Sequence, residues 1–169
     1  NSRIQQLIKK RKWNELDNFQ RIKAIYDFVR DEILFGYNVD DSITASEVLA
    51  DGYGQCNTKG TLFMALLRAC SIPCRIHGFT IDKKLQKGAM TGLVYKNAPQ
   101  NIFHSWVEVC FENKWYELEA FILDTMYLNK LQEMNGNCAG AFCGYGVAVN
   151  DFRNPIIDFN RNNTYIQSE

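Results

Sequence analysis

A long apolar stretch in the middle of the chain limits what this sequence can fold into. From Asn57 to Ser71, apolar side chains recur at helical spacing and polar positions are few. The apolar stripe consists of Leu62, Phe63, Leu66, Leu67 and Cys70. Pro73 cannot continue a helix, so the helix must end before it. We predict that this is the central, most buried helix of the fold.

Other helices are expected before this stretch, and strands after it. Asp17 with Gln20, and Thr44 with Glu47, resemble capping boxes that open two earlier helices. Residues 74–81, 104–111 and 115–119 have the composition or alternation of strands, and residues 126–134 predict a late helix. Helices followed by an antiparallel sheet predict an α+β fold. We expect a loop with at most one short strand in 82–103, and no firm pattern after residue 135.

The composition fits one domain spanning residues 1–169. Hydrophobic residues make up 46% of the 169 positions, enough for a substantial core. A formal net charge of zero argues against nucleic acid or an anionic membrane as a partner, and no apolar run is long enough to span a bilayer. The chain starts at Asn1 without a Met, so we expect a trimmed N-terminus. Cysteines that remain free thiols favour a cytoplasmic location.

The six cysteines do not form a recognisable metal site. Cys138 and Cys143 lie in a Gly-rich segment where they could pair or bind a metal. Their spacing and the presence of only two histidines fit the ligand rules for zinc poorly. We therefore expect neither a metal nor an organic cofactor.

Cys56 differs from the other cysteines in its position. It follows Gly54 and Gln55 and stands where the central helix begins. Unpaired N–H groups and the helix dipole stabilise an anion there, which favours the reactive thiolate. A small buried hydrophobic side chain is the alternative on Cys56 alone.

A predicted hairpin brings a possible base and its partner together. Glu112-Asn113 fits a two-residue turn, which places Glu119 opposite Trp106 and on the same face as His104. A turn one residue later would move them farther apart. A His104–Glu119 hydrogen bond would orient the imidazole, and we expect His104 to be half exposed in a cleft with Trp106 shielding the pair. Taken singly, a histidine in a strand is usually structural and a glutamate at a strand end is usually solvated; with Cys56 they supply a nucleophile, a base and an orienting group.

The chain resembles the transglutaminase-like superfamily over residues 20–122. The resemblance rests on Gly54-Gln55-Cys56, Leu66-Leu67-Arg68-Ala69, Ile72-Pro73-Cys74-Arg75, His104-Ser105-Trp106 and Trp115-Tyr116-Glu117-Leu118-Glu119. It implies a papain-like core and a catalytic triad at Cys56, His104 and Glu119. Glu119 stands where the family usually has Asp, and Ser71 replaces the usual Gly before Ile72-Pro73.

The resemblance implies a cysteine protease or amidase acting on peptides or proteins through a thioester acyl-enzyme. The backbone N–H of Cys56 would hold the oxyanion with a second donor, for which Gln55, Tyr53 and Tyr37 are candidates. The alternatives are transglutaminase-type transfer to an amine and a catalytically silent peptide-binding module. Residues 82–103 are expected to form a wall of the substrate cleft.

Overall fold

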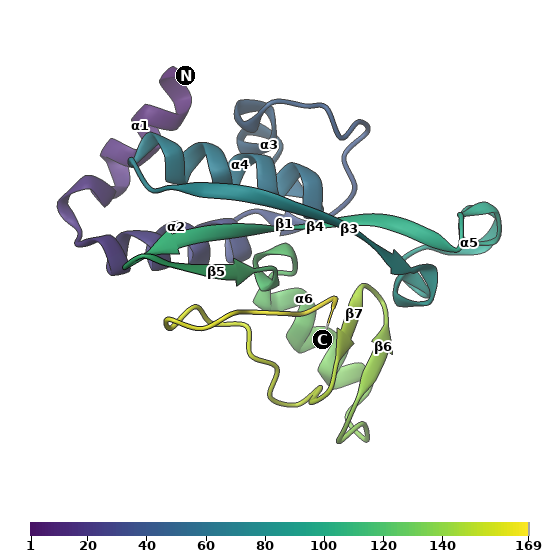
Figure 1. Cartoon of the computed structure of the whole chain (residues 1–169). Coiled ribbons are helices and arrows are strands. Elements are labelled where there is room, and N and C mark those ends of the chain that lie inside the picture. The colour runs from purple at the N-terminus through teal and green to yellow at the C-terminus, as the bar shows by residue number, and fades with distance from the viewer. Residues whose placement is uncertain (169) are drawn as a thin grey trace.

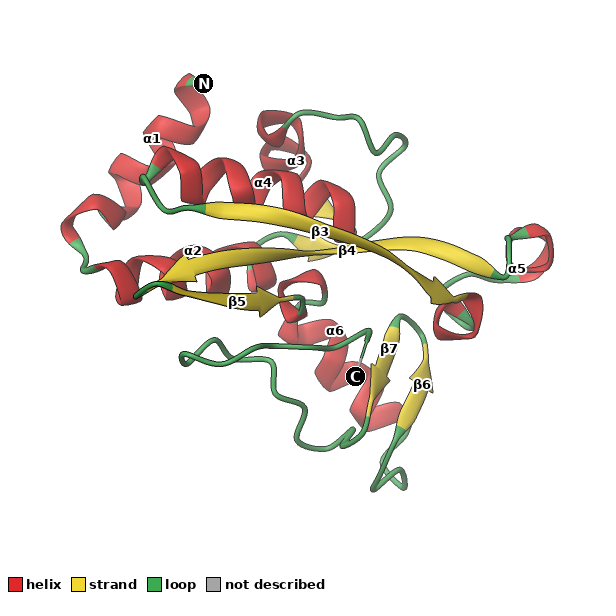
Figure 2. Cartoon of the chain, viewed as in Figure 1, coloured by secondary structure: helices red, strands yellow, loops and turns green. Residues whose placement is uncertain are grey.

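The computed structural model describes residues 1–168 and confirms the α+β class (Figures 1 and 2). The helices are α1 (Ser2–Arg11), α2 (Asn18–Asp31), α3 (Ala45–Asp51), α4 (Cys56–Ala69), α5 (Gly92–Asn97) and α6 (Thr125–Met134). The strands are β1 (Leu34–Phe35), β2 (Tyr53–Gly54), β3 (Cys74–Asp82), β4 (Asn101–Phe111), β5 (Lys114–Leu118), β6 (Phe142–Gly144) and β7 (Val147–Val149). Three 3-10 helices are η1 (Trp13–Glu15), η2 (Lys83–Gln86) and η3 (Ala120–Ile122).

The main sheet is antiparallel, in the order β3-β4-β5. Phe111 pairs with Lys114, so the turn falls at Glu112-Asn113 as predicted. Both turn residues have positive φ, 51° and 60°, which is the conformation of the tight hairpin turns that match strand twist. The turn fixes the register of a hairpin of this kind. The two turn residues, Glu112 and Asn113, therefore determine that Glu119 lies on the same face of the sheet as His104.

Helix α4 lies across one face of this sheet, as Figure 1 shows. Its predicted stripe of Leu62, Phe63, Leu66, Leu67 and Cys70 is buried, which confirms the central helix. A Cβ at Gly60 would lie 3.7 Å from Ile76 and from Val107, so the helix approaches β3 and β4 closely at this point. Helix α2 covers another side of α4, where the rings of Tyr26 and Phe63 meet at 6.0 Å. This close packing fixes the start of α4 relative to the strands.

Local signals located the early helices well, with one exception. Asp17 accepts a hydrogen bond from the Gln20 backbone at the start of α2, and Thr44 and Glu47 form the capping box of α3. Helix α1 was not predicted. Its buried residues are Ile4 and Ile8, four positions apart on one face of the helix.

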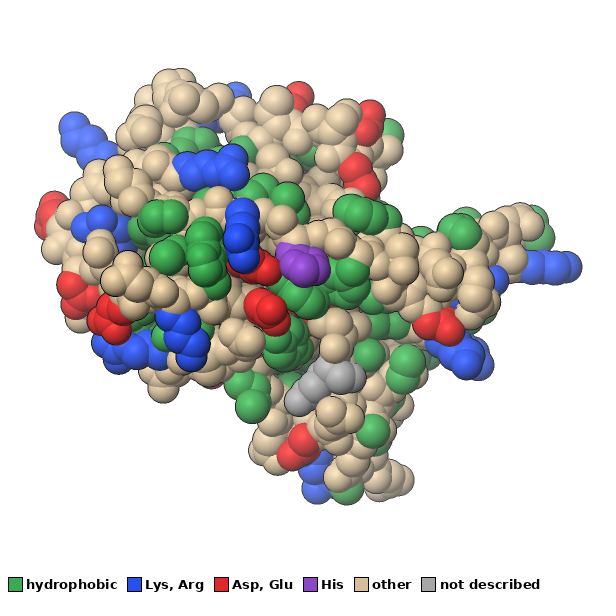
Figure 3. Space-filling model, viewed as in Figure 1, with side chains coloured by type: hydrophobic (Ala, Val, Ile, Leu, Met, Phe, Trp, Pro, Cys, Tyr) green, Lys and Arg blue, Asp and Glu red, His purple; other side chains and the backbone are tan. Residues whose placement is uncertain are grey.

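The segment between β3 and β4 differs from the prediction. The short strand expected near Leu93 is wrong: those residues form helix α5, and η2 precedes it. Helix α5 lies at the end of the projection on the right of Figures 1 and 3. It buries no side chain, and its Leu93 and Val94 are exposed. Without packing on the core, its residues give no sequence periodicity from which to predict a helix.

Residues 125–168 pack back onto the sheet. Helix α6 confirms the predicted late helix, and β6 pairs with β7 in a short hairpin. After β7 an irregular segment returns beneath β5, where Thr164 bridges to Leu118 (Figure 2). Phe152, Phe159 and Ile166 are buried in the main hydrophobic cluster. None of the helices in residues 1–168 is long and apolar enough to cross a membrane.

Candidate active site

Cys56 is the first residue of α4, directly after β2 and the N-cap residue Gln55. The entry into the helix is tight: a Cβ at Gly54 would come within 2.6 Å of Thr58 Oγ1. The Thr58 hydroxyl accepts from the Gln55 backbone N–H at 3.0 Å, which satisfies one of the unpaired groups at the helix start. The Cys56 sulfur is therefore held at the positive end of a 14-residue helix.

His104 and Glu119 are joined by a hydrogen bond of 2.6 Å between His104 Nε2 and Glu119 Oε1. His104 comes from β4 and Glu119 from the residue after β5, the N-cap of η3. The expected half-exposed histidine is wrong: His104 is only 1% exposed and Glu119 is fully buried. The alternation of β4 gives the face of the strand but not what covers that face, and here the ring of Phe79 covers His104, edge to face at 5.0 Å.

The pKa of His104 is the main electrostatic feature of the site. Burial disfavours the imidazolium, but hydrogen bonds with Cys56 and with Glu119 outweigh it and raise this pKa to about 9. The negative charges of both partners act in the same direction. The ring thus binds Glu119 through Nε2 and has the Cys56 side chain as its other partner. The arrangement therefore places an imidazolium beside the Cys56 side chain.

The second oxygen of Glu119 is held by the C-terminal segment. Glu119 Oε2 accepts hydrogen bonds from the backbone N–H groups of Ile166 and Gln167, both at 2.8 Å. Sequence reasoning missed these two donors because backbone groups carry no residue signature. They hold one carboxylate oxygen while the other bonds to His104.

A polar network of side chains connects the start of α4 to β4. Asn57 donates to Asp41 at 2.7 Å and accepts from the hydroxyl of Ser105 at 2.9 Å. The Cys56 sulfur lies 3.8 Å from the same Asn57 oxygen. Since Ser105 is next to His104 in β4, this network sets the spacing between the elements that carry Cys56 and His104.

Lys59 is a second feature that the sequence did not single out. It lies one helical turn after Cys56, is fully buried, and donates to the carbonyl oxygens of Arg30 and Ile122 at 3.1 and 3.0 Å. Burial lowers its pKa to about 7, against the opposing charges of Asp124 and Asp31. These bonds tie α4 to the end of α2 and to the end of η3, whose N-cap residue is Glu119.

The remaining predicted site residues are placed differently. Both ends of the Gln55 amide have hydrogen-bond partners in the protein: its nitrogen donates to Asp41 and its oxygen accepts from the backbone N–H of Asn38. Tyr53 packs over Gly36 and does not line the cleft that holds Cys56. The Trp106 ring stacks on His77 at 4.8 Å and contacts the Phe79 ring at 4.5 Å. Phe79 in turn contacts the His104 ring, so Phe79 links Trp106 to His104.

A cleft of about 250 Å³ opens onto Cys56 and His104. Its other lining side chains are Phe35, Tyr37, Asn38, Asp41, Gln55, Asn57, Ile81, Gln86, Met90, Ile102, Phe103, Ile122 and Gln167. Four of them, Gln86, Met90, Ile102 and Phe103, come from residues 82–103, so the segment expected to form a cleft wall does line this cleft.

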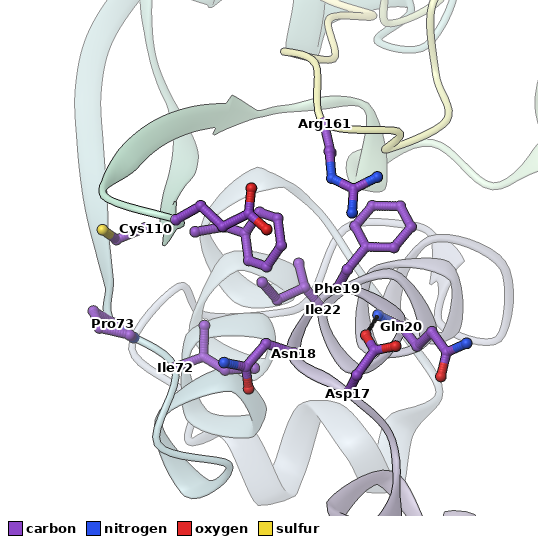
Figure 4. A pocket seen from close by; sticks show the side chains of 11 residues that line it. Asp17, Asn18, Phe19, Gln20, Ile22, Ile72, Pro73, Cys110 and Arg161 are labelled. Carbon is purple, nitrogen blue, oxygen red and sulfur yellow. Dashed lines mark hydrogen bonds between the residues drawn. The ribbon is translucent and has the colours of Figure 1, made fainter.

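A larger hollow of about 550 Å³ lies at the other end of β4 (Figure 4). Here Arg161 lies over the ring of Phe19 at 4.3 Å, and Asp17 caps α2. Cys110 reaches it, but the lining of this hollow contains no histidine. The chemistry therefore favours the smaller cleft as the active site.

The other cysteines do not form a second centre. All six thiols are free, including Cys138 and Cys143. Residues 1–168 contain no cluster of three or more His, Cys, Asp or Glu side chains that could hold a metal ion.

Comparison with known proteins gives the family and the fold. The family model described as transglutaminase-like superfamily matches residues 5–120. A proposed cysteine protease from Cytophaga hutchinsonii has a similar structure, with a TM-score of 0.54 and 24% identity over 74% of this chain. Red sea bream transglutaminase matches over 61% of the chain at 17% identity and a TM-score of 0.40. The chain spans 39% and 22% of the lengths of these two proteins. No curated protein sequence matches it.

Proposed function

Because this chain belongs to the transglutaminase-like superfamily, we propose that it is a cysteine-dependent hydrolase of amide bonds in peptides or proteins. The observation that carries the proposal is the His104 ring, which contacts Cys56 on one side and the doubly anchored Glu119 on the other. Nucleophilic catalysis requires a nucleophile, a base and a group that orients the base. Fold alone would not support an activity, since members of one fold differ in function.

In the proposed cycle the Cys56 thiolate attacks the carbonyl carbon of the amide, and the π electrons of the carbonyl move to oxygen. When that oxyanion collapses, the C–N bond breaks and the leaving nitrogen takes the proton of the His104 imidazolium. A thioester to Cys56 remains. Water then attacks the thioester and gives a proton to His104, so the acid leaves and the thiolate–imidazolium pair is restored. Glu119 holds the ring orientation throughout and stays ionised.

The same thioester would support the alternative, transfer to an amine, so the two are separated by competition. A peptide amide is incubated with the protein and an excess of a primary amine, and the products are separated by mass spectrometry. We expect mainly the free acid, with the acyl-enzyme mass on Cys56 and no product from a Cys56→Ala variant. A predominant amine adduct would make the protein a transglutaminase instead.

A third outcome would favour the silent peptide-binding module. The peptide would then bind the cleft, neither product would form, and Cys56 would carry no acyl group. Replacing the amide by an activated ester makes this result decisive, because an ester acylates any competent thiolate–imidazolium pair.

A further inference from the structure

Gln86 stands out among the cleft side chains that the proposed cycle does not use. It is the last residue of η2, in the segment between β3 and β4, and lines the same cleft as Cys56 and His104. The residue is only 7% exposed. A carboxamide this deeply buried needs partners for both of its ends.

Only one end of the Gln86 carboxamide has a partner. Its Oε1 accepts a hydrogen bond of 2.6 Å from the phenol of Tyr37. Within residues 1–168, no group accepts a hydrogen bond from Gln86 Nε2, although the atom retains some contact with the cleft solvent. Two N–H donors are therefore left for a molecule that enters the cleft.

Tyr37 keeps the carboxamide in this orientation. Burial, with a smaller contribution from the charge of Cys56, raises the pKa of Tyr37 to about 12, so the phenol stays protonated and donates. In the hydrogen bond of 2.6 Å the phenol donates to the amide oxygen, so the amide nitrogen faces away from Tyr37. Tyr37 and Gln86 line the same cleft as Cys56.

The backbone around Gln86 is anchored by the β6–β7 turn. The Tyr145 N–H donates to Lys87 O and the Gly146 N–H to Leu85 O, both at 2.8 Å. The ring of Tyr145 occupies the space beside Gly88, where a Cβ would come within 2.5 Å of it. A donor on such a fixed element needs little reorganisation when charge develops near it.

We propose that Gln86 Nε2 donates a hydrogen bond to the carbonyl oxygen of the amide that Cys56 attacks. Gln86 is then the second oxyanion donor beside the Cys56 backbone N–H, a catalytic residue of the proposed function on which this inference rests. Gln55 is a weaker candidate, because its amide nitrogen already donates to Asp41 and its amide oxygen accepts from Asn38, and Tyr53 lies outside the cleft lining. The donor comes from the segment between the two long strands rather than from the start of α4.

The test compares two reactions of Cys56 that differ only in the need for an oxyanion. Iodoacetamide alkylates the thiolate by displacing iodide at a saturated carbon, with no oxyanion. A p-nitrophenyl ester acylates it through a tetrahedral oxyanion and releases p-nitrophenolate. Second-order rate constants for both reagents are measured for the wild type and for Gln86→Ala and Gln86→Glu. Gln100→Ala is the matched control, because Gln100 lies in the same segment and its side-chain amide donates to the exposed Asp82, outside the cleft lining.

We expect Gln86→Ala to acylate about 10²-fold more slowly, as for the loss of one oxyanion-hole donor, while its alkylation rate stays within about twofold. Gln86→Glu should be slower still because its carboxylate repels the oxyanion, and Gln100→Ala should match the wild type. Equal losses with both reagents would mean that Gln86 only supports the fold, and unchanged acylation would remove it from the reaction; either overturns the inference. A wild type that is alkylated at Cys56 but never acylated would instead overturn the proposed function.

Tyr37→Phe gives a second measurement should the Gln86 variants unfold. It removes the group that orients the carboxamide but leaves both N–H donors in place. We expect a several-fold loss of acylation with alkylation unchanged, and an unchanged ratio of the two rates would contradict the inference.

Discussion

Glu119 and Gln167 are 48 positions apart in the chain, yet the Gln167 backbone N–H donates to Glu119 Oε2 at 2.8 Å. The neighbouring N–H of Ile166 binds the same oxygen. The two carboxylate oxygens therefore bind different partners: one bonds to His104 and the other accepts from the C-terminal segment. This explains how a Glu can stand where the family usually has an Asp: its longer side chain spans from the end of β5 to both partners.

The length and charge of Glu119 can be tested separately. Glu119→Gln keeps the length, but its amide must turn N–H donors either toward the two backbone N–H groups or toward His104 Nε2. The second orientation favours the wrong tautomer of the ring. We expect the rate of amide hydrolysis to fall by about 10²–10⁴, as for the amide substitution in the serine triad, with the thermal midpoint lowered but the fold retained.

Glu119→Asp is one methylene shorter and cannot reach His104 and both backbone N–H groups together. We expect it to lose activity as well, even though it restores the usual family residue. Circular dichroism on both variants separates a misoriented ring from an unfolded protein. Wild-type activity in Glu119→Gln would show that another group orients His104, and Asp124 would be the next to test.

Cys56 should be alkylated first among the six thiols at pH 6. Its partner His104 is still an imidazolium at that pH, and the helix start also stabilises the thiolate. A limiting amount of iodoacetamide followed by peptide mapping gives the order of labelling across pH 4–9.

Cys70 and Cys74 are the internal controls of that experiment, because burial raises the pKa of both thiols and they should be labelled slowly. His104→Ala should remove the reactivity of Cys56 at low pH while the slow labelling of these two stays unchanged. Preferential labelling of any other thiol in the native protein would contradict the nucleophile assignment.

Much of the active-site framework could be predicted because it depends on local periodicity. The stripe of α4 and its stop at Pro73 follow from helical spacing, and the two-residue turn at Glu112 sets the register of β4 and β5. A period of two then places His104 and Glu119 on one face. None of these inferences needs a contact between distant segments.

The rest could not be predicted because it depends on distant contacts or on backbone atoms. The amides of Ile166 and Gln167 hold Glu119 from a segment with no strand or helix pattern. Lys59 would be expected on the surface from its charge, yet it is buried because two free carbonyl oxygens face it. The burial of His104 depends on the ring of Phe79, and strand alternation does not show what covers a face.

The charge on His104 should make stability depend on pH in a defined window. Its pKa is raised from 6.5 to about 9 on folding, so the folded state binds more protons between these values. The stabilisation from the charged ring is complete below pH 6.5 and is lost as pH rises through 9. We expect the difference in unfolding free energy between the wild type and His104→Gln to shrink steadily over pH 6.5–9.5 in urea titrations.

Taking the difference removes the titration of Lys59, which both proteins contain. The control is needed because burial lowers the Lys59 pKa to about 7. The titration of Lys59 therefore raises the free energy of unfolding as pH rises above 7, opposite to the effect of His104. A difference that stayed constant or grew with pH would show that His104 is not charged in the folded protein.

Ser71 offers a test of the fold that does not involve the cleft. It follows α4 with φ of 59°, in the left-handed region, where the family usually has Gly. The Ser71 and Ile72 N–H groups close the helix by donating to Arg68 O and Leu67 O at 3.0 and 2.9 Å, so this conformation is required. A Cβ is strained there, and Ser71→Gly should raise the unfolding free energy by about 1 kcal/mol with alkylation of Cys56 unchanged.

Ser46→Gly, in the first turn of α3, is the matched control and should lower the unfolding free energy by about 0.5 kcal/mol, because glycine is a poor helix former. If both substitutions destabilise the protein equally in urea titrations, the left-handed conformation of Ser71 carries no strain.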